Sequence, residues 1–189
     1  MTTPGVDEPQ VDDDPELVHW KASQFRSVAA SANYLALDRP DIQCAVKELC
    51  RAMAKPTEES WRKLYRLAKY LTHKPRLIIH YKWQDPVNEI STFSDANWAG
   101  CLKSRKSTSG GVVKWGKHLL RSWSKTQTSI DLSLAENEFY ATLKAARESL
   151  GMISMGREFN QTLSVRLMVD ASAALGVAQR QGIGKIRHL

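Results

Sequence analysis

Three carboxylates in this sequence occupy positions that favour metal chemistry. Asp95 follows the apolar segment 90–93, Glu136 lies in the first turn of a predicted helix, and Asp170 ends a second apolar segment, 163–169. A strand end or a helix start holds a side chain rigidly and leaves it open to solvent. Two Mg²⁺ ions about 3.5–4 Å apart on such oxygen ligands can activate a water and neutralise the leaving oxygen of a phosphodiester. These three residues are therefore candidate metal ligands and catalytic residues.

Each carboxylate taken singly also has a structural explanation. Glu136 would interact favourably with its helix dipole, a contribution of about 0.3–1 kcal/mol, and Asp170 would cap the turn after its strand. The three cysteines, Cys44, Cys50 and Cys101, are widely spaced and have no paired zinc-ligand pattern. They indicate reduced thiols, so any metal site would rest on oxygen ligands.

The first half of the chain carries a helical pattern. Apolar residues recur at three- and four-residue spacing through residues 20–71. Pro40, preceded by Asp38, is typical of one helix start, and Thr57 with Ser60 three residues later predicts another. The helix predicted to start at Thr57 has a basic face. This face is either a solvated surface or a contact for phosphate groups.

The second half alternates between strand and helix patterns. Residues 77–81 and 90–93 predict strands, and residues 110–115 and 119–123 predict a hairpin around Gly116-Lys117. Ser133 is a suitable cap for a long helix ending near Arg157. A strand at 163–169 and a short helix at 171–179 complete a mixed α/β domain.

Composition divides the chain into three regions. Residues 1–16 form an acidic leader that we expect to be disordered, residues 17–75 a helical segment, and residues 76–189 the α/β domain. Without the six acids of the leader, 27 basic residues face 14 acidic ones, a net charge of +13 that favours a polyanionic partner such as nucleic acid. The sequence predicts no membrane span and no secretory signal.

Short ordered segments surround each of the three carboxylates and the predicted hairpin. They are Ser94-Asp95-Ala96-Asn97-Trp98-Ala99-Gly100, Arg105-Lys106-Ser107-Thr108-Ser109-Gly110, Ser122-Trp123-Ser124-Lys125, Leu132-Ser133-Leu134-Ala135-Glu136-Asn137-Glu138-Phe139 and Val169-Asp170-Ala171-Ser172-Ala173-Ala174. Together they resemble the ribonuclease H region of copia-type (Ty1/copia) retrotransposon Pol polyproteins. Upstream, Phe25-Arg26-Ser27, Tyr34-Leu35, Arg39-Pro40-Asp41-Ile42 and Ala45-Val46 resemble the connection between reverse transcriptase and that nuclease. The resemblance extends over residues 20–189.

The resemblance implies a ribonuclease H-like mixed five-stranded sheet with flanking helices, preceded by the small helical connection segment. It implies an endonuclease that hydrolyses the RNA strand of an RNA–DNA hybrid, with two Mg²⁺ ions, or Mn²⁺ as the alternative, on Asp95, Glu136 and Asp170. Asp95 would bridge both ions. The remainder of the Pol polyprotein, including reverse transcriptase, would be a partner. The expected location is cytoplasmic, in a virus-like particle, or nuclear.

Basic residues near the hairpin are candidate contacts for nucleic acid. Arg105, Lys106, Ser107 and Lys125 would touch the hybrid backbone, and the alternative for the first three is a solvated loop. The wide minor groove of a hybrid would expose the 2′-hydroxyls that identify RNA.

One other function remains open at this point, and a second is disfavoured by the order of the acids. The family uses a fourth carboxylate after a Lys-His-Ile-like stretch, and the segment 185–189 resembles its approach, which predicts a C-terminally truncated domain. The alternative function is therefore an inactive fragment that retains hybrid binding. An integrase or transposase relative would have its acids in the order Asp, Asp, Glu, whereas Glu136 precedes Asp170 here.

Overall fold

The computed structural model describes residues 3–5, 14–101, 104–170, 175, 176 and 179. The chain divides into two compact units, residues 1–80 and residues 81–189, which we call the helical unit and the sheet unit. The sequence-based boundary after residue 75 falls just before this division. Among the described residues, no helix is long and apolar enough to cross a membrane.

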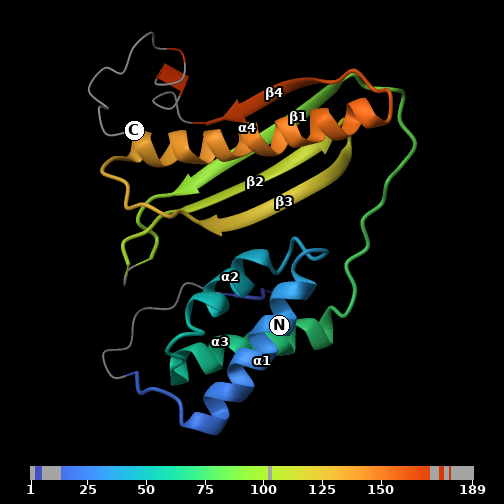
Figure 1. Ribbon diagram of the computed structural model, residues 1–189. Coiled ribbons are helices and arrows are strands. Elements are labelled where there is room, and N and C mark those ends of the chain that lie inside the picture. The colour runs from blue at the N-terminus through green and yellow to red at the C-terminus, as the bar shows by residue number, and fades with distance from the viewer. Residues whose placement is uncertain (1–2, 6–13, 102–103, 171–174, 177–178, 180–189) are drawn as a thin grey trace. The chain divides into compact units, whose positions relative to one another are not determined.

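The helical unit consists of α1 (His19–Leu35), α2 (Gln43–Arg51) and α3 (Glu58–His73), as the apolar spacing predicts (Figure 1). Thr57 and Ser60 form a reciprocal capping box at the start of α3, which confirms the predicted cap. The start predicted at Pro40 is displaced, because α2 begins at Gln43 and its N-cap, Ile42, makes no side-chain cap. The three helices enclose an apolar core that includes Phe25, Ile42, Val46, Leu49 and Leu67.

Part of the expected disordered leader lies against the start of α3. The backbone N–H of Glu58 donates to the carbonyl of Pro15 at 3.1 Å, and that of Glu59 donates to the carboxylate of Asp14 at 2.9 Å. These acceptors satisfy two of the amide groups that every helix start leaves without an intrahelical partner. Residues 14–16 therefore lie against the start of α3, while residues 6–13 of the leader lie outside the described residues.

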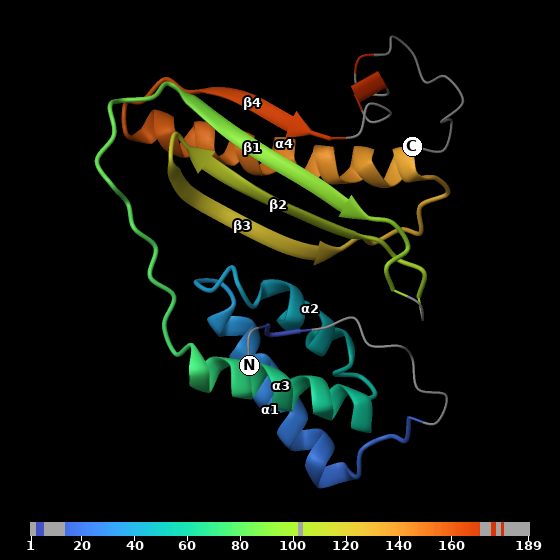
Figure 2. The same cartoon turned by 180° about the vertical axis from the view of Figure 1, so that it is seen from behind.

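The sheet unit consists of β1 (Glu89–Asn97), β2 (Thr108–Trp115), β3 (His118–Thr126), α4 (Leu134–Glu158) and β4 (Ser164–Val169). The strand order is β3-β2-β1-β4; β1 runs parallel to β4 and antiparallel to β2, which is antiparallel to β3. Helix α4 lies along one face of the sheet, and the view from behind shows the other face (Figure 2). This mixed α/β architecture confirms the predicted fold class and is consistent with a ribonuclease H-like fold. The described residues contain four strands rather than the five expected, and the helix predicted at 171–179 lies mostly outside them.

The strand predicted at residues 77–81 is absent. These residues form no sheet pairs, and Ile78 is 71% exposed. Their apolar spacing suits a strand, but no strand among the described residues pairs with them. Instead, the hydroxyl of Tyr81 donates to the carbonyl of Leu119 on β3 at 2.8 Å.

Polar groups fill much of the space between α4 and the sheet. Thr92 on β1 and Ser149 on α4 are buried with their hydroxyl oxygens 2.7 Å apart. The side-chain amide of Gln127 donates to Ser109 on β2 and to Asn137 on α4, both at 2.9 Å. These hydrogen bonds fix the start of α4 against the sheet.

Candidate metal centre

Asp95 and Asp170 are brought together by the pairing of β1 with β4. The parallel register matches Ser94 with Val169, so the next residues along the two strands are Asp95 and Asp170. Neighbouring strands lie about 4.8 Å apart, and residues in register point to the same side of a sheet. The structure therefore places two exposed carboxylates side by side where β1 and β4 end.

Glu138 supplies the third carboxylate. One carboxylate oxygen from each of Asp95, Glu138 and Asp170 lies within 4.8 Å of the others. Glu138 is buried, whereas both aspartates are exposed. It reaches the strand ends because it lies on the face of α4 that packs against the sheet, as do the buried residues Ala141 and Ala145.

Glu136, the residue expected from the sequence, is not brought into this cluster. Its carboxylate accepts the backbone N–H of Leu132 at 2.8 Å, and its own N–H donates to the Ser133 hydroxyl at 3.2 Å. Residues two apart on a helix point in nearly opposite directions. Glu136 therefore makes hydrogen bonds at the start of α4, where the sequence alternatively predicted a favourable interaction with the helix dipole, and Glu138 is the acid of α4 in the cluster.

A signal for Glu138 was present in the sequence. Glu138, Ala141, Ala145 and Ser149 recur at three- and four-residue spacing, and all four are buried on one side of α4. An acid in line with small residues on a sheet-facing stripe is better placed to reach strand ends than an acid two positions earlier.

The electrostatics of the cluster suit a cation. Burial, followed by the negative charges of Asp170 and Asp95, raises the pKa of Glu138 to about 7. The same burial and repulsion would be relieved by a bound divalent cation, because opposite charge favours the ionised carboxylate. Three hard oxygen donors with no sulfur or imidazole among them fit Mg²⁺ or Mn²⁺.

The four predicted nucleic-acid contacts have different settings. Arg105 and Lys125 are exposed and Lys106 is half-buried. Ser107 is fully buried; its hydroxyl accepts the N–H of Ala99 at 3.1 Å. Arg105 and Lys125 are thus open to a ligand, whereas Ser107 holds the loop between β1 and β2.

A further acid, Asp131, lies beside this loop. It is 5% exposed, and burial, together with the charge of Glu136, raises its pKa. The indole N–H of Trp98 reaches the carbonyl of Asp131 at 3.4 Å. Asp131 therefore belongs to the packing between the β1–β2 loop and the start of α4.

Comparison with known proteins points to transposon polyproteins. The chain is 32% identical over 142 residues to the retrovirus-related Pol polyprotein from transposon RE2 of Arabidopsis thaliana, covering 75% of this chain and 10% of that protein. For the corresponding polyprotein of transposon RE1 from the same plant, identity is 33% over 145 residues, 77% of this chain and 10% of that protein. The chain is also 30% identical to the secreted RxLR effector protein 161 of Plasmopara viticola. This match covers 66% of this chain and 87% of the effector protein.

No protein-family model matches the chain. The chain spans about a tenth of the length of the two polyproteins. Their similarity extends over about three quarters of its residues. The chain therefore belongs to the family of copia-type retrotransposon Pol polyproteins and is similar to one region of them.

Proposed function

We propose that the sheet unit is a ribonuclease H-type module that hydrolyses the RNA strand of an RNA–DNA hybrid. The observation that carries this proposal is the convergence of Asp95, Glu138 and Asp170 at the ends of a parallel strand pair and beside α4. The motifs that contain these three acids in the sequence point to the same activity.

The three carboxylates would hold two Mg²⁺ ions, or Mn²⁺ as the alternative. When bound, the ions supply charge neutralisation at the scissile phosphate and a water of lowered pKa. Asp95 and Asp170 contribute rigid placement, since each is fixed by the end of a strand in a hydrogen-bonded pair. Glu138 contributes a buried carboxylate whose position is set by α4 before any ligand arrives.

Basic residues near the cluster would hold the substrate. Lys125 is in register with Ser109 on β2, which is in register with Ala96, the residue after Asp95. Two strand spacings separate β1 from β3, about 10 Å. Exposed Lys125 shares the sheet face of Ala96 and would contact the substrate backbone from that face. Exposed Arg105 would contact the same backbone from the β1–β2 loop.

As part of a larger polyprotein, this module would act beside the polymerase that makes the hybrid. The proposal places it in cytoplasmic virus-like particles or in the nucleus, wherever the element is reverse-transcribed. The helical unit would then be the connection between the polymerase and the nuclease.

The test is cleavage of an end-labelled RNA–DNA hybrid by the full chain with Mg²⁺. We expect the wild-type chain to cut only the RNA strand, and Asp95→Asn and Glu138→Gln to fall to background. Glu136→Gln is the matched control, because the glutamine carbonyl oxygen can still accept the N–H of Leu132. It should keep most of the activity.

Two results would contradict the proposal. Background cleavage by the folded wild-type chain would reject the nuclease and favour a fragment that only binds hybrid. Wild-type cleavage by Glu138→Gln, with loss of activity in Glu136→Gln, would reassign the third ligand.

A further inference from the structure

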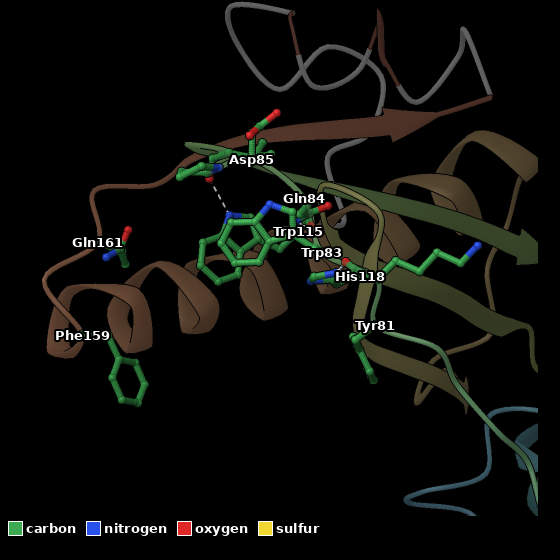
Figure 3. A pocket seen from close by; sticks show the side chains of 11 residues that line it. Tyr81, Trp83, Gln84, Asp85, Trp115, His118, Phe159 and Gln161 are labelled. Atoms are coloured by element: carbon green, nitrogen blue, oxygen red, sulfur yellow. Dashed lines mark hydrogen bonds between the residues drawn. The ribbon is translucent and has the colours of Figure 1, made fainter.

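A second candidate site lies at the opposite end of the sheet from the acidic cluster. A cavity of about 580 Å³ is lined by Tyr81, Trp83, Trp115, His118, Phe159 and Gln161, among others (Figure 3). Trp115 is paired with Ile90 near the start of β1, whereas Asp95 lies near its end. At roughly 3.3 Å per residue, these positions on β1 are about 17 Å apart. The cavity is therefore separate from the metal centre.

The wall of this cavity is held in place by hydrogen bonds between residues 81–87 and the β2–β3 hairpin. The side-chain amide of Gln84 donates to the carbonyl of Trp115 at 3.0 Å and accepts the N–H of Lys117 at 2.7 Å. The Nε2 of His118 lies 2.7 Å from the carbonyl of Lys82. The segment is thus fixed before a ligand binds, which lowers the entropic cost of binding.

The cavity presents aromatic surface to solvent. The exposed fraction is 90% for Trp83, 71% for Phe159 and 57% for Tyr81. A smaller cavity of about 190 Å³ shares Trp115, Phe159 and Gln161 with the first and is otherwise lined mostly by apolar side chains. Several exposed aromatic rings in one place mark a binding surface rather than scattered apolar residues.

The charges around these rings favour an anionic ligand. Lys82 lines the cavity and Lys117 lies in the hairpin turn beside it; both are exposed, and neither has an ion pair within the part of the chain that the structure describes. Asp85 adds one negative charge to the lining against these two positive charges. Its carboxylate can accept a hydrogen bond at the edge of a planar ring, and the side-chain amide of Gln161 can accept or donate one. Aromatic faces combined with lysines are the features that hold single-stranded nucleic acid by stacking and phosphate attraction.

We propose that this cavity binds a base of single-stranded nucleic acid, with Trp83 as the stacking residue and Lys82 and Lys117 attracting the flanking phosphates. The site is distinct from the proposed nuclease centre and does not depend on its activity. It would hold an unpaired strand about 17 Å from the cluster, as measured along β1.

The test is equilibrium binding of fluorescent oligothymidylate and oligouridylate, each about 15 nucleotides long, to the full chain. EDTA prevents cleavage. Trp83→Ala should weaken binding about 5- to 150-fold, the range that corresponds to loss of one stacked base. Trp83→Phe should restore most of it. The matched control is Trp20→Ala, since Trp20 is also exposed, at 67%, but lies on α1.

A second probe separates stacking from general charge attraction. With an oligonucleotide of abasic sites, Trp83→Ala should bind as the wild type does, because no base is present to stack. Thermal unfolding of each variant checks that the fold is intact, and Trp83 is exposed enough that little change is expected.

Three results would overturn the proposal. The first is equal oligothymidylate and oligouridylate affinity for Trp83→Ala and Trp20→Ala. The second is an equal effect of Trp83→Ala on abasic and base-containing strands. The third is a change in oligomeric state on sedimentation without a change in oligonucleotide affinity, which would make the cavity a protein contact instead.

Discussion

The interiors of the two units are built from different chemistry. Among the described residues other than proline and glycine, the buried set of the helical unit comprises twelve apolar and three polar or charged residues, whereas that of the sheet unit comprises five apolar and nine polar or charged residues. Apolar burial is non-directional and stabilises many arrangements of similar volume. Hydrogen bonds are directional, so the polar interior of the sheet unit constrains where α4 lies on β1. The helical unit is built for stability, and the sheet unit for the placement of its acids.

The largest effect should come from the apolar core of the helical unit. Phe25 is fully buried on α1, so Phe25→Ala should lower the free energy of unfolding by about 3–5 kcal/mol. Val28→Ala, on the same helix but 41% exposed, should change it by less than about 0.5 kcal/mol. Urea unfolding followed by circular dichroism measures both, and similar losses would show that the core is not the source of stability.

The next largest loss of stability should come from breaking the ion pair between Arg39 and Asp41 in the helical unit. Arg39 donates two hydrogen bonds to Asp41, at 2.9 and 2.8 Å, and the hydroxyl of Tyr70 donates a third at 2.9 Å. These contacts, the one from Arg39 foremost, hold the pKa of Asp41 below its usual value of 3.8. Asp41→Asn should therefore cost about 1.5–3 kcal/mol at neutral pH.

The pH dependence of that loss has a definite sign. Because the folded-state pKa is lowered, the stabilisation by Asp41 is complete above 3.8 and is lost as pH falls through the folded-state value. The melting temperatures of wild type and Asp41→Asn should converge in that acidic window. Asp38→Asn, at an exposed neighbour, is the control, and curves for Asp41→Asn that stay parallel to wild type would contradict the assignment.

In the sheet unit, removing one or the other hydroxyl of the buried pair Thr92 and Ser149 should lower stability by different amounts. Ser149 donates to the carbonyl of Ala145 at 2.8 Å, so the Thr92 hydroxyl is the donor in its 2.7 Å contact with Ser149. Ser149→Ala would leave Thr92 buried without an acceptor and should cost about 1–3 kcal/mol. Thr92→Val, which leaves Ser149 bonded to Ala145, should cost less. Denaturant titration of both variants tests this, and a larger loss in Thr92→Val would reverse the inferred donor.

The smallest difference in stability between variants of the two units is expected at the starts of α3 and α4. The hydroxyl of Thr57 accepts the N–H of Ser60 at the start of α3, and that of Ser133 accepts the N–H of Glu136 at the start of α4. Thr57→Ala and Ser133→Ala should each cost about 1 kcal/mol. Equal losses of stability in thermal unfolding would show that the two units differ in their interiors and not in their helix caps. A several-fold larger loss for Ser133→Ala would show that the units differ in their helix caps as well.

Local patterns in the sequence predicted most of the elements. The β2–β3 hairpin, the helix capped by Ser133 and the strand before Asp170 all depend on residues near one another in the chain, so spacing alone reveals them. The segment 77–81 has the same apolar spacing as a strand, but a strand also needs a partner. That pairing is a tertiary property that the segment itself does not encode.

The sequence predicted only part of the candidate site, because one of its residues also depends on tertiary packing. Asp95 and Asp170 could be identified because each directly follows an apolar strand pattern. The choice between Glu136 and Glu138 depended on which side of α4 faces the sheet. The acid of the first turn has a local role in capping, and only the buried stripe through Ala141 and Ala145 shows that Glu138 faces the strand ends.

The register of β1 with β4 has a consequence for synthesis of the chain. Asp95 cannot meet Asp170 until β2, β3 and α4, which lie between them in the sequence, have all been made and β4 has paired with β1. A contact of such sequence separation forms late, since its loop must close first. A ribosome-bound chain would therefore carry no assembled acidic cluster until residue 170 had emerged. Any activity that depends on the three carboxylates would begin only after β4 has joined the sheet.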